Sequence, residues 1–236
     1  MSCRCSKVVF VVTFVLVGIV SRPSVQATPL IVGSAILSAP GPGPVGGVVV
    51  ANSGPVPFTS ATFQGTLTSE VIGSDPANPF GPGNLTFTYM LTNTGGPESI
   101  DRLTVPGWGI PGLLTDASYQ APVLPGNIIP TSFDRSIDPL GNVIGVFFTP
   151  PVTGLGAIPP GGTSALVVIQ TNSTQFNPSV ASMIDGSTAQ ATTFAPLLVF
   201  GSPEPSTLVL GLVGFAGLGA MVRNRMLRAK LFFGQQ

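Results

Sequence analysis

Carboxylates in two short clusters are the residues of this chain that could carry out acid–base or metal chemistry. Each cluster contains two carboxylates and one arginine: Asp134, Arg135 and Asp138 in FDRSIDPLGN, and Glu98, Asp101 and Arg102 in PESIDR. Two carboxylates can supply the acid and the base of a hydrolase, and carboxylate oxygens are good ligands for Ca²⁺. The clusters therefore raise two hypotheses, a carboxylate hydrolase and a calcium site.

A structural role in turns fits these acidic residues better. Asp and Asn beside Pro and Gly commonly form turns, because their side chains accept hydrogen bonds from nearby backbone amides. Residues 134–142 also lack the alternating D-x-[DN]-x-[DN]-G pattern of an EF-hand loop. Asp185, in Ile184-Asp185-Gly186-Ser187, lacks the Asp-Thr/Ser-Gly order of an aspartic protease. That stretch instead predicts a hairpin turn before a strand over residues 187–198.

Other kinds of catalysis are excluded by the residue types that the sequence lacks. The chain has no histidine, and both cysteines, Cys3 and Cys5, lie close to the N-terminus. The two lysines, Lys7 and Lys230, also lie near the ends. Ser-His-Asp, Cys-His and Ser-Lys catalysis, and His- or Cys-ligated metals, are therefore not available to the body of the chain. We expect a body that is not an enzyme and that holds no cofactor or metal.

The charge distribution indicates which class of partner the body could bind. Seven of the nine basic residues lie near the two ends, whereas the body carries two arginines against eight Asp and Glu residues, a net charge of −6. An acidic body is not suited to the phosphate backbone, so we expect no nucleic-acid partner. Trp108, between Gly107 and Gly109, could stack on a sugar if its ring were exposed, but a position at the edge of the core is favoured.

The elements that position these residues are predicted to be strands. The sequence contains 30 glycines and 25 prolines, which favours short strands joined by turns. Apolar and polar residues alternate over residues 59–71 and again over 85–92. Further strands are expected over residues 102–105, 143–149, 164–171 and 187–198. We therefore predict an all-β fold, an antiparallel β-sandwich over residues 59–201, preceded by a Pro/Gly-rich segment over 28–58 that forms a strand or two or a linker.

Two of the predicted strands carry a family resemblance. LTFTYMLTNTGG, over residues 85–96, and PPGGTSALVVIQTN, over residues 159–172, resemble the immunoglobulin-like strand pairs of bacterial secreted and surface proteins. The resemblance covers only these two segments. It implies an immunoglobulin-like sandwich and does not indicate a ligand.

The N-terminus is typical of a secretory signal peptide over residues 1–27. Arg4 and Lys7 precede an apolar stretch over residues 8–20, which is shorter than the roughly 20 residues that span a bilayer. Small residues before Thr28 predict cleavage between Ala27 and Thr28, with an uncleaved N-terminal anchor as the alternative. The signal implies Sec-type export, and its removal leaves a mature chain without cysteine or disulfide.

The C-terminal residues 202–236 combine three features. Pro203 and Pro205 hold the backbone around Glu204 in an extended conformation that an enzyme can bind. The uncharged stretch over residues 208–222 then predicts a single transmembrane helix. Basic residues follow it directly: Arg223, Arg225, Arg228 and Lys230. A basic flank stays on the cytoplasmic side, so we expect the body to face outward.

This order of parts resembles the PEP-CTERM sorting signal of bacterial secreted proteins. The resemblance implies that an exosortase, a membrane enzyme, recognises Pro203, Glu204 and Pro205, processes the tail and sends the body to the outer surface or a polysaccharide matrix. AKLFFGQQ, over residues 229–236, extends beyond the usual end of such signals. A sortase Leu-Pro-x-Thr-Gly motif is absent, and a GPI signal would lack the basic flank. A permanent single-pass anchor is the main alternative.

Three functions of the body are left open by the sequence. These are a structural or adhesive component of the envelope or biofilm matrix, a carbohydrate- or calcium-binding module, and a carboxylate hydrolase. The first is favoured, because Thr- and Ser-rich strand surfaces without a convergent reactive set suit a structural role.

Overall fold

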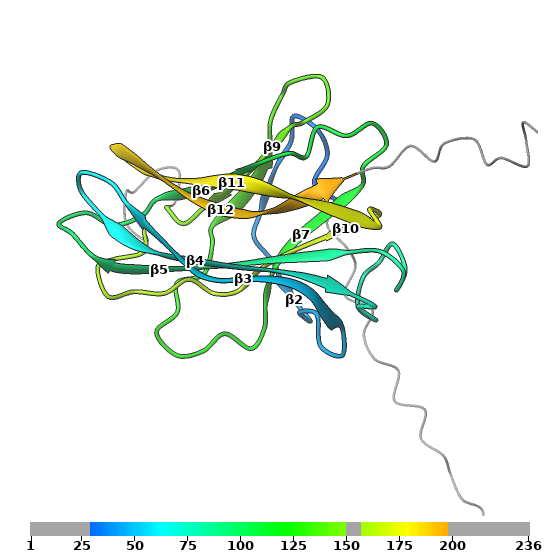
Figure 1. Ribbon diagram of the computed structural model, residues 1–236, viewed down its shortest axis with the longest axis horizontal. Coiled ribbons are helices and arrows are strands. Elements are labelled where there is room, and N and C mark those ends of the chain that lie inside the picture. The colour runs from blue at the N-terminus through cyan, green and yellow to red at the C-terminus, as the bar shows by residue number, and fades with distance from the viewer. Residues whose placement is uncertain (1–28, 150–156, 198–236) are drawn as a thin grey trace, which may run out of the picture.

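The computed structural model describes residues 29–149 and 157–197, which form two six-stranded β-sheets that face each other (Figure 1). Sheet I runs in spatial order β2 (Pro40–Gly41), β7 (Thr115–Gln120), β10 (Val167–Thr171), β5 (Thr86–Gly95), β4 (Gln64–Gly73) and β3 (Val48–Thr59). Sheet II runs β1 (Ala35–Leu37), β8 (Ser132–Arg135), β9 (Val143–Phe147), β6 (Arg102–Pro106), β11 (Gln175–Asp185) and β12 (Ser187–Leu197). Neighbouring strands are antiparallel, except that β2 is parallel to β7. The described residues include no helix long and apolar enough to cross a membrane.

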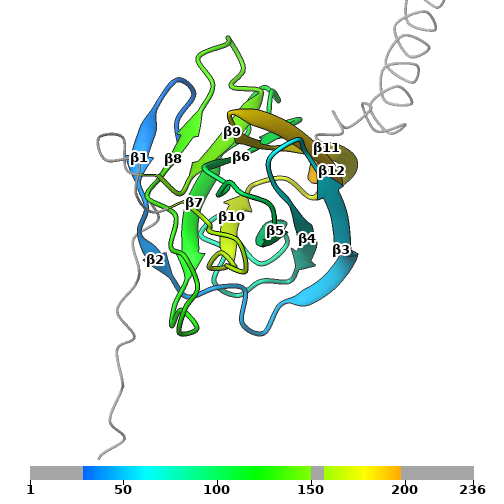
Figure 2. The same cartoon turned by 90° about the vertical axis from the view of Figure 1, so that its left-hand side faces the viewer.

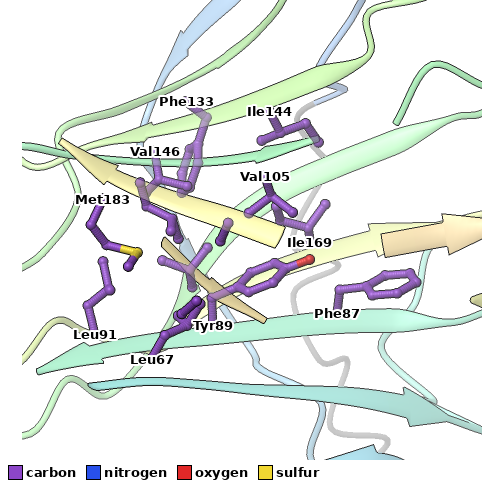
Figure 3. Close-up of a cluster of buried hydrophobic side chains, with 14 of the residues drawn as sticks. Leu67, Phe87, Tyr89, Leu91, Val105, Phe133, Ile144, Val146, Ile169 and Met183 are labelled. Carbon is purple, nitrogen blue, oxygen red and sulfur yellow. The ribbon is translucent and has the colours of Figure 1, made fainter. Parts of the chain in front are cut away.

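The core lies between the two sheets and is built from the alternating apolar residues of the strands (Figure 3). Leu67 of β4 and Leu91 of β5 project from sheet I toward Met183 of β11 in sheet II, and all three are almost completely buried. Successive strand residues point to opposite faces, so this alternation places one face of each strand in the core. The all-β fold expected from the sequence is thus confirmed.

Two side-chain hydrogen bonds hold the last strand against the rest of the sandwich. Tyr89 on β5 donates from its hydroxyl to the Phe194 carbonyl of β12 at 2.8 Å, across the core. Ser173 donates to the Leu197 carbonyl at 2.8 Å, at the last described residue of the chain. Burial raises the pKa of Tyr89 far above its usual range, so this hydroxyl keeps its proton and remains a donor.

The predicted hairpin turn is confirmed. β11 and β12 pair along their full lengths from Asp185 opposite Ser187, and only Gly186 lies between those two residues. Gly186 has a φ of +59°, in the left-handed region that glycine adopts without a steric penalty.

The sandwich begins earlier in the chain than the sequence predicted. The segment over residues 28–58 contributes β1 and β2 and most of β3, so the boundary at residue 59 is corrected. The prolines of this segment indicated that it could not form a long central strand, and β3 is an edge strand, where proline is tolerated because one side of the strand has no ladder partner. β3 also changes register twice, between Val49 and Ala51 and between Asn52 and Pro55.

The predicted terminal signals lie outside the described residues. These are the signal peptide with its cleavage site at Ala27 and Thr28, and the sorting segment over residues 202–236 with its transmembrane helix and basic flank.

Candidate functional site

An ion pair joins the two carboxylate clusters across sheet II. Arg102 on β6 and Asp134 on β8 lie on either side of β9, and Arg102 Nη2 donates to both Asp134 carboxylate oxygens, at 3.0 and 3.1 Å. The guanidinium also lies 4.2 Å from the centre of the Phe147 ring. Gly145 of β9 lies beneath the pair, because a Cβ there would overlap the Asp134 carboxylate. The absence of a side chain at Gly145 thus allows the ion pair to cross β9.

This ion pair is a surface feature. The Arg102 side chain is 33% exposed and that of Asp134 is 28% exposed. A pair with this access to water contributes about 1 kcal/mol or less to stability. Its chemical effect is that the Asp134 carboxylate is paired with the Arg102 guanidinium.

Asp138 has the turn role that its sequence context favoured. Its carboxylate accepts hydrogen bonds from the Ser136 hydroxyl and from the backbone amides of Leu140 and Asn142, the latter at 2.9 Å. These bonds, with that from Ser136 the strongest, lower the pKa of Asp138. The side chain therefore closes the 136–142 loop by hydrogen bonding to its own backbone.

Arg135 is buried, which its position between two carboxylates did not indicate. Only 4% of the residue is exposed. Its guanidinium donates to four backbone carbonyls, at distances of 2.9 to 3.2 Å: those of Trp108, Leu113, Leu140 and Gly141. Burial lowers the pKa of Arg135, and the nearby charge of Asp138 opposes that shift. The side chain fastens two separate loops, 107–114 and 136–142, to the end of β8.

Three carboxylates, Glu98, Asp101 and Asp185, lie near one another at the β11–β12 turn. Asp101 accepts a hydrogen bond from Thr149 Oγ1 at 2.8 Å. Partial burial raises the pKa of Asp185, and repulsion by Asp101 and then by Glu98 raises it further. Within residues 29–149 and 157–197, no group of three or more acidic, His or Cys side chains has a geometry that could hold a metal ion.

Asp185→Asn is expected to stabilise the fold at neutral pH. Because the pKa of Asp185 is raised on folding, the folded protein binds this proton more tightly than the unfolded chain does. Stability is therefore lost as the pH rises from the usual Asp pKa of 3.8 through the raised value. The variant avoids that loss, so its melting temperature at pH 7 should be higher by about 1 to 3 °C, allowing for solvent screening.

Thermal melts of both proteins from pH 3 to pH 8 would measure this effect. The difference should vanish at the acid end, where the wild-type carboxyl is also neutral, and should shrink in high salt. A variant that is less stable than wild type at pH 7 would contradict the repulsion.

Trp108 is completely buried, so its ring is not available to stack on a sugar. The ring packs edge-on against Phe87 with centroids 5.4 Å apart. Its backbone amide donates to the Asn142 carbonyl at 2.9 Å. The favoured sequence interpretation placed Trp108 at the edge of the core, and the structure places it inside.

A buried carboxylate that the sequence did not single out is Asp75, which has no exposed surface. It accepts hydrogen bonds from Thr86 Oγ1 at 2.7 Å, Gln170 Nε2 at 3.1 Å and the Ala77 amide at 2.9 Å. The Asp75-Pro76 pair was a recognisable turn signal, but its burial depends on strands far away in the sequence. Asp75 fixes the loop between β4 and β5 to the outer face of sheet I.

A cavity of about 300 Å³ lies beside the loop that follows β7. Its lining is formed by residues without titratable side chains, mostly apolar: Met90, Gln120, Pro122, Val123, Leu124, Asn127, Ala165 and Leu166. The cavity therefore offers shape and apolar surface but no acid or base.

No family model, curated protein or solved structure matches this chain.

Proposed function

We propose that this chain is an exported bacterial surface or extracellular-matrix protein with a structural or adhesive body, sorted by an exosortase through its C-terminal signal. The observation that carries the proposal is the order of parts in residues 202–236, in a chain whose first residues are typical of a secretory signal peptide. Pro203, Glu204 and Pro205 are the recognition residues. The apolar stretch over 208–222 and the basic residues after it hold this substrate at the membrane until it is processed.

The arrangement of charged side chains in the body supports a structural role. Both arginines and the carboxylates of FDRSIDPLGN are engaged in ways that maintain the fold: Arg102 with Asp134, Arg135 with loop carbonyls, and Asp138 with its own turn. A hydrolase of the two-carboxylate type needs an acid and a base placed on either side of the scissile bond. In this structure Asp134 and Asp138 have separate structural partners instead.

Three partners follow from the proposed route. The Sec-type machinery exports the chain, the exosortase-type enzyme processes it, and extracellular polysaccharide surrounds the released body. A permanently membrane-anchored carbohydrate- or calcium-binding module is the alternative function. Calorimetric titration of the body with Ca²⁺ and binding to a polysaccharide array distinguish a specific binding module from a purely structural one.

Fractionation of the wild-type protein tests the proposed route. The protein carries a tag after Gln236 and is expressed in a host with an exosortase and in the same host without it. With the enzyme, antibodies to the body should find the protein at the outer surface or in the medium without its tag. Without the enzyme, the tagged chain should stay in the membrane fraction. Retention of the tag in the membrane in both hosts would replace the proposal with a permanent anchor.

A further inference from the structure

Four strands form the edges of the sandwich, and they differ in how well they could pair with another chain. β1 and β2 are only three and two residues long. β12 is long, but its exposed residues near the turn are polar: Thr188, Gln190 and Thr192. β3 is twelve residues long and begins with three consecutive valines. Among the four edges, β3 is the one that combines length with exposed apolar side chains.

The first residues of β3 have the properties of an unprotected edge. Val48, Val49 and Val50 are 59%, 51% and 49% exposed. β3 pairs with β4 on one side and with no other strand of the described residues. An exposed apolar edge strand presents unpaired backbone groups that can pair with another strand, and proteins usually block such edges with proline, charge or bulges.

Proline and a left-handed glycine protect only the second half of β3, and the first half carries only the register shift between Val49 and Ala51. Pro55 and Pro57 lack the amide that a new strand would need, and Gly54 has a φ of +60°, which breaks the regular strand. The first half, from Val48 to Asn52, contains no proline and no charged residue. A second strand can therefore add to this half alone.

We propose that residues 48–52 of β3 pair with the same residues of a second copy of this chain, antiparallel about a two-fold axis. Such an interface is isologous, so the same apolar surface must complement itself. The segment meets that condition, because two uncharged copies bring no like charges together and bury their valines against each other. The pairing joins sheet I of the two copies into one continuous sheet.

The position of this edge also favours a second copy over a lipid surface. β3 and β12 lie along the same side of the sandwich (Figure 2). Across sheet I, Val49 of β3 lies opposite Ile72 of β4, which lies opposite Thr86 of β5. The neighbouring Leu85 amide donates to the Ser173 carbonyl, and the Ser173 hydroxyl donates to the Leu197 carbonyl. The valines are thus at the end of the fold where the chain leaves β12.

If the residues after Leu197 carry the proposed anchor, the first half of β3 lies at the end of the fold nearest the membrane. Only this part of the inference depends on the proposed function. Lipid tails cannot satisfy the free backbone amides and carbonyls of an edge strand, whereas a second strand can. Anchoring also concentrates copies with the same orientation on one surface, which favours their association.

Cysteine cross-linking of the full chain tests the pairing directly. The native cysteines are replaced (Cys3→Ser, Cys5→Ser), and the unprocessed protein is purified in mild detergent from a host without an exosortase. Val48→Cys, Val49→Cys and Val50→Cys are made one at a time and treated with an oxidant. At least one of them should form a disulfide-linked dimer, because directly opposite residues of paired strands lie within disulfide range. Leu124→Cys and Val180→Cys, at exposed sites away from this edge, are the controls and should stay uncross-linked.

A charge on the edge provides the second test. The wild-type chain should have the mass of two chains by light scattering, and Val49→Lys should halve it, with the circular dichroism spectrum of the folded protein unchanged. A single-chain mass for wild type, a dimeric Val49→Lys, or cross-linking of the controls equal to that of the valine variants would overturn the proposal. Loss of binding to phospholipid vesicles by Val49→Lys without a change in mass would overturn it in favour of lipid contact. None of these measurements requires tail processing, so the result is separate from that of the sorting experiment.

Discussion

Arg135→Met should lower the free energy of unfolding of the body by about 3 to 5 kcal/mol. Methionine fills a similar length but donates no hydrogen bond. Its substitution removes the guanidinium donor from four buried or half-buried carbonyls, of which only that of Trp108 still accepts from a backbone amide, that of Ile110. The two loops then remain joined by the bonds of the Trp108 and Gly109 amides to Asn142. The loss is large because each buried acceptor left unsatisfied carries its full desolvation cost.

Arg102→Met is the matched control. It makes the same change at the other arginine of the body, which takes part in a surface ion pair. Its cost should be about 1 kcal/mol or less. Urea unfolding of a fragment covering residues 28–201, followed by circular dichroism, measures the loss of unfolding free energy in both variants. The sequence predicts that this fragment folds without metal or disulfides. Equal costs for the two arginines would show that burial of Arg135 does not govern its contribution.

Replacing Pro203-Glu204-Pro205 with three alanines should abolish processing of the tail while leaving membrane insertion intact. The replacement changes neither the apolar stretch over residues 208–222 nor the basic residues after it. In the proposed route, insertion and orientation depend on those two features, whereas recognition depends on the triplet. The variant should therefore accumulate as full-length, membrane-bound protein with an exposed body, whereas the wild-type protein loses its C-terminal tag.

Neutralising Arg223, Arg225 and Arg228 is the complementary change. It should weaken orientation and retention at the inner membrane, because these charges set the topology. Fractionation with antibodies to the body and to the tag separates the two effects. If the triple-alanine variant loses its tag as efficiently as wild type does, the triplet is not the recognition element.

Strands with one face in the core and the other in water could be predicted from the sequence. The alternation around Leu67 in β4 and around Tyr89 in β5 is of this kind. Gly186 likewise marked the turn between β11 and β12 correctly. In each case the information is local, because residues two apart in a strand share a face.

Strands β7, β8 and β11 were not predicted. In β7, tertiary contacts decide which residues are buried. In β7, Asp116 and Ser118 are polar, yet both are at least nine-tenths buried on the outer face of sheet I. Gly41 of β2 lies so close that a Cβ there would meet the Ser118 hydroxyl. Segments remote in sequence cover this face, so the polar residues that alternate with Ala117 and Tyr119 in β7 are buried instead of facing water.

The site shows the same division between local and long-range information. The turn role of Asp138 depends on residues within four positions of it, and the sequence context favoured it. The pairing of Arg102 with Asp134 joins residues 32 positions apart, and depends on β9 lying between β6 and β8. Arg135 resembles a solvent-exposed charge in the sequence, and only the arrangement of two loops around it accounts for its burial.

The hydrogen bonds from Tyr89 and Ser173 to β12 have a mechanical consequence. The described chain leaves the sandwich from β12, so any force on the residues after Leu197 reaches the fold through this strand. Leu197 lies opposite Gln175 at the open end of the β11–β12 hairpin, where a sideways pull would separate the strands one ladder bond at a time. The Leu197 and Phe194 carbonyls accept hydrogen bonds from side chains outside the hairpin, those of Ser173 and Tyr89. These two hydrogen bonds must therefore break before the strands of the hairpin can separate.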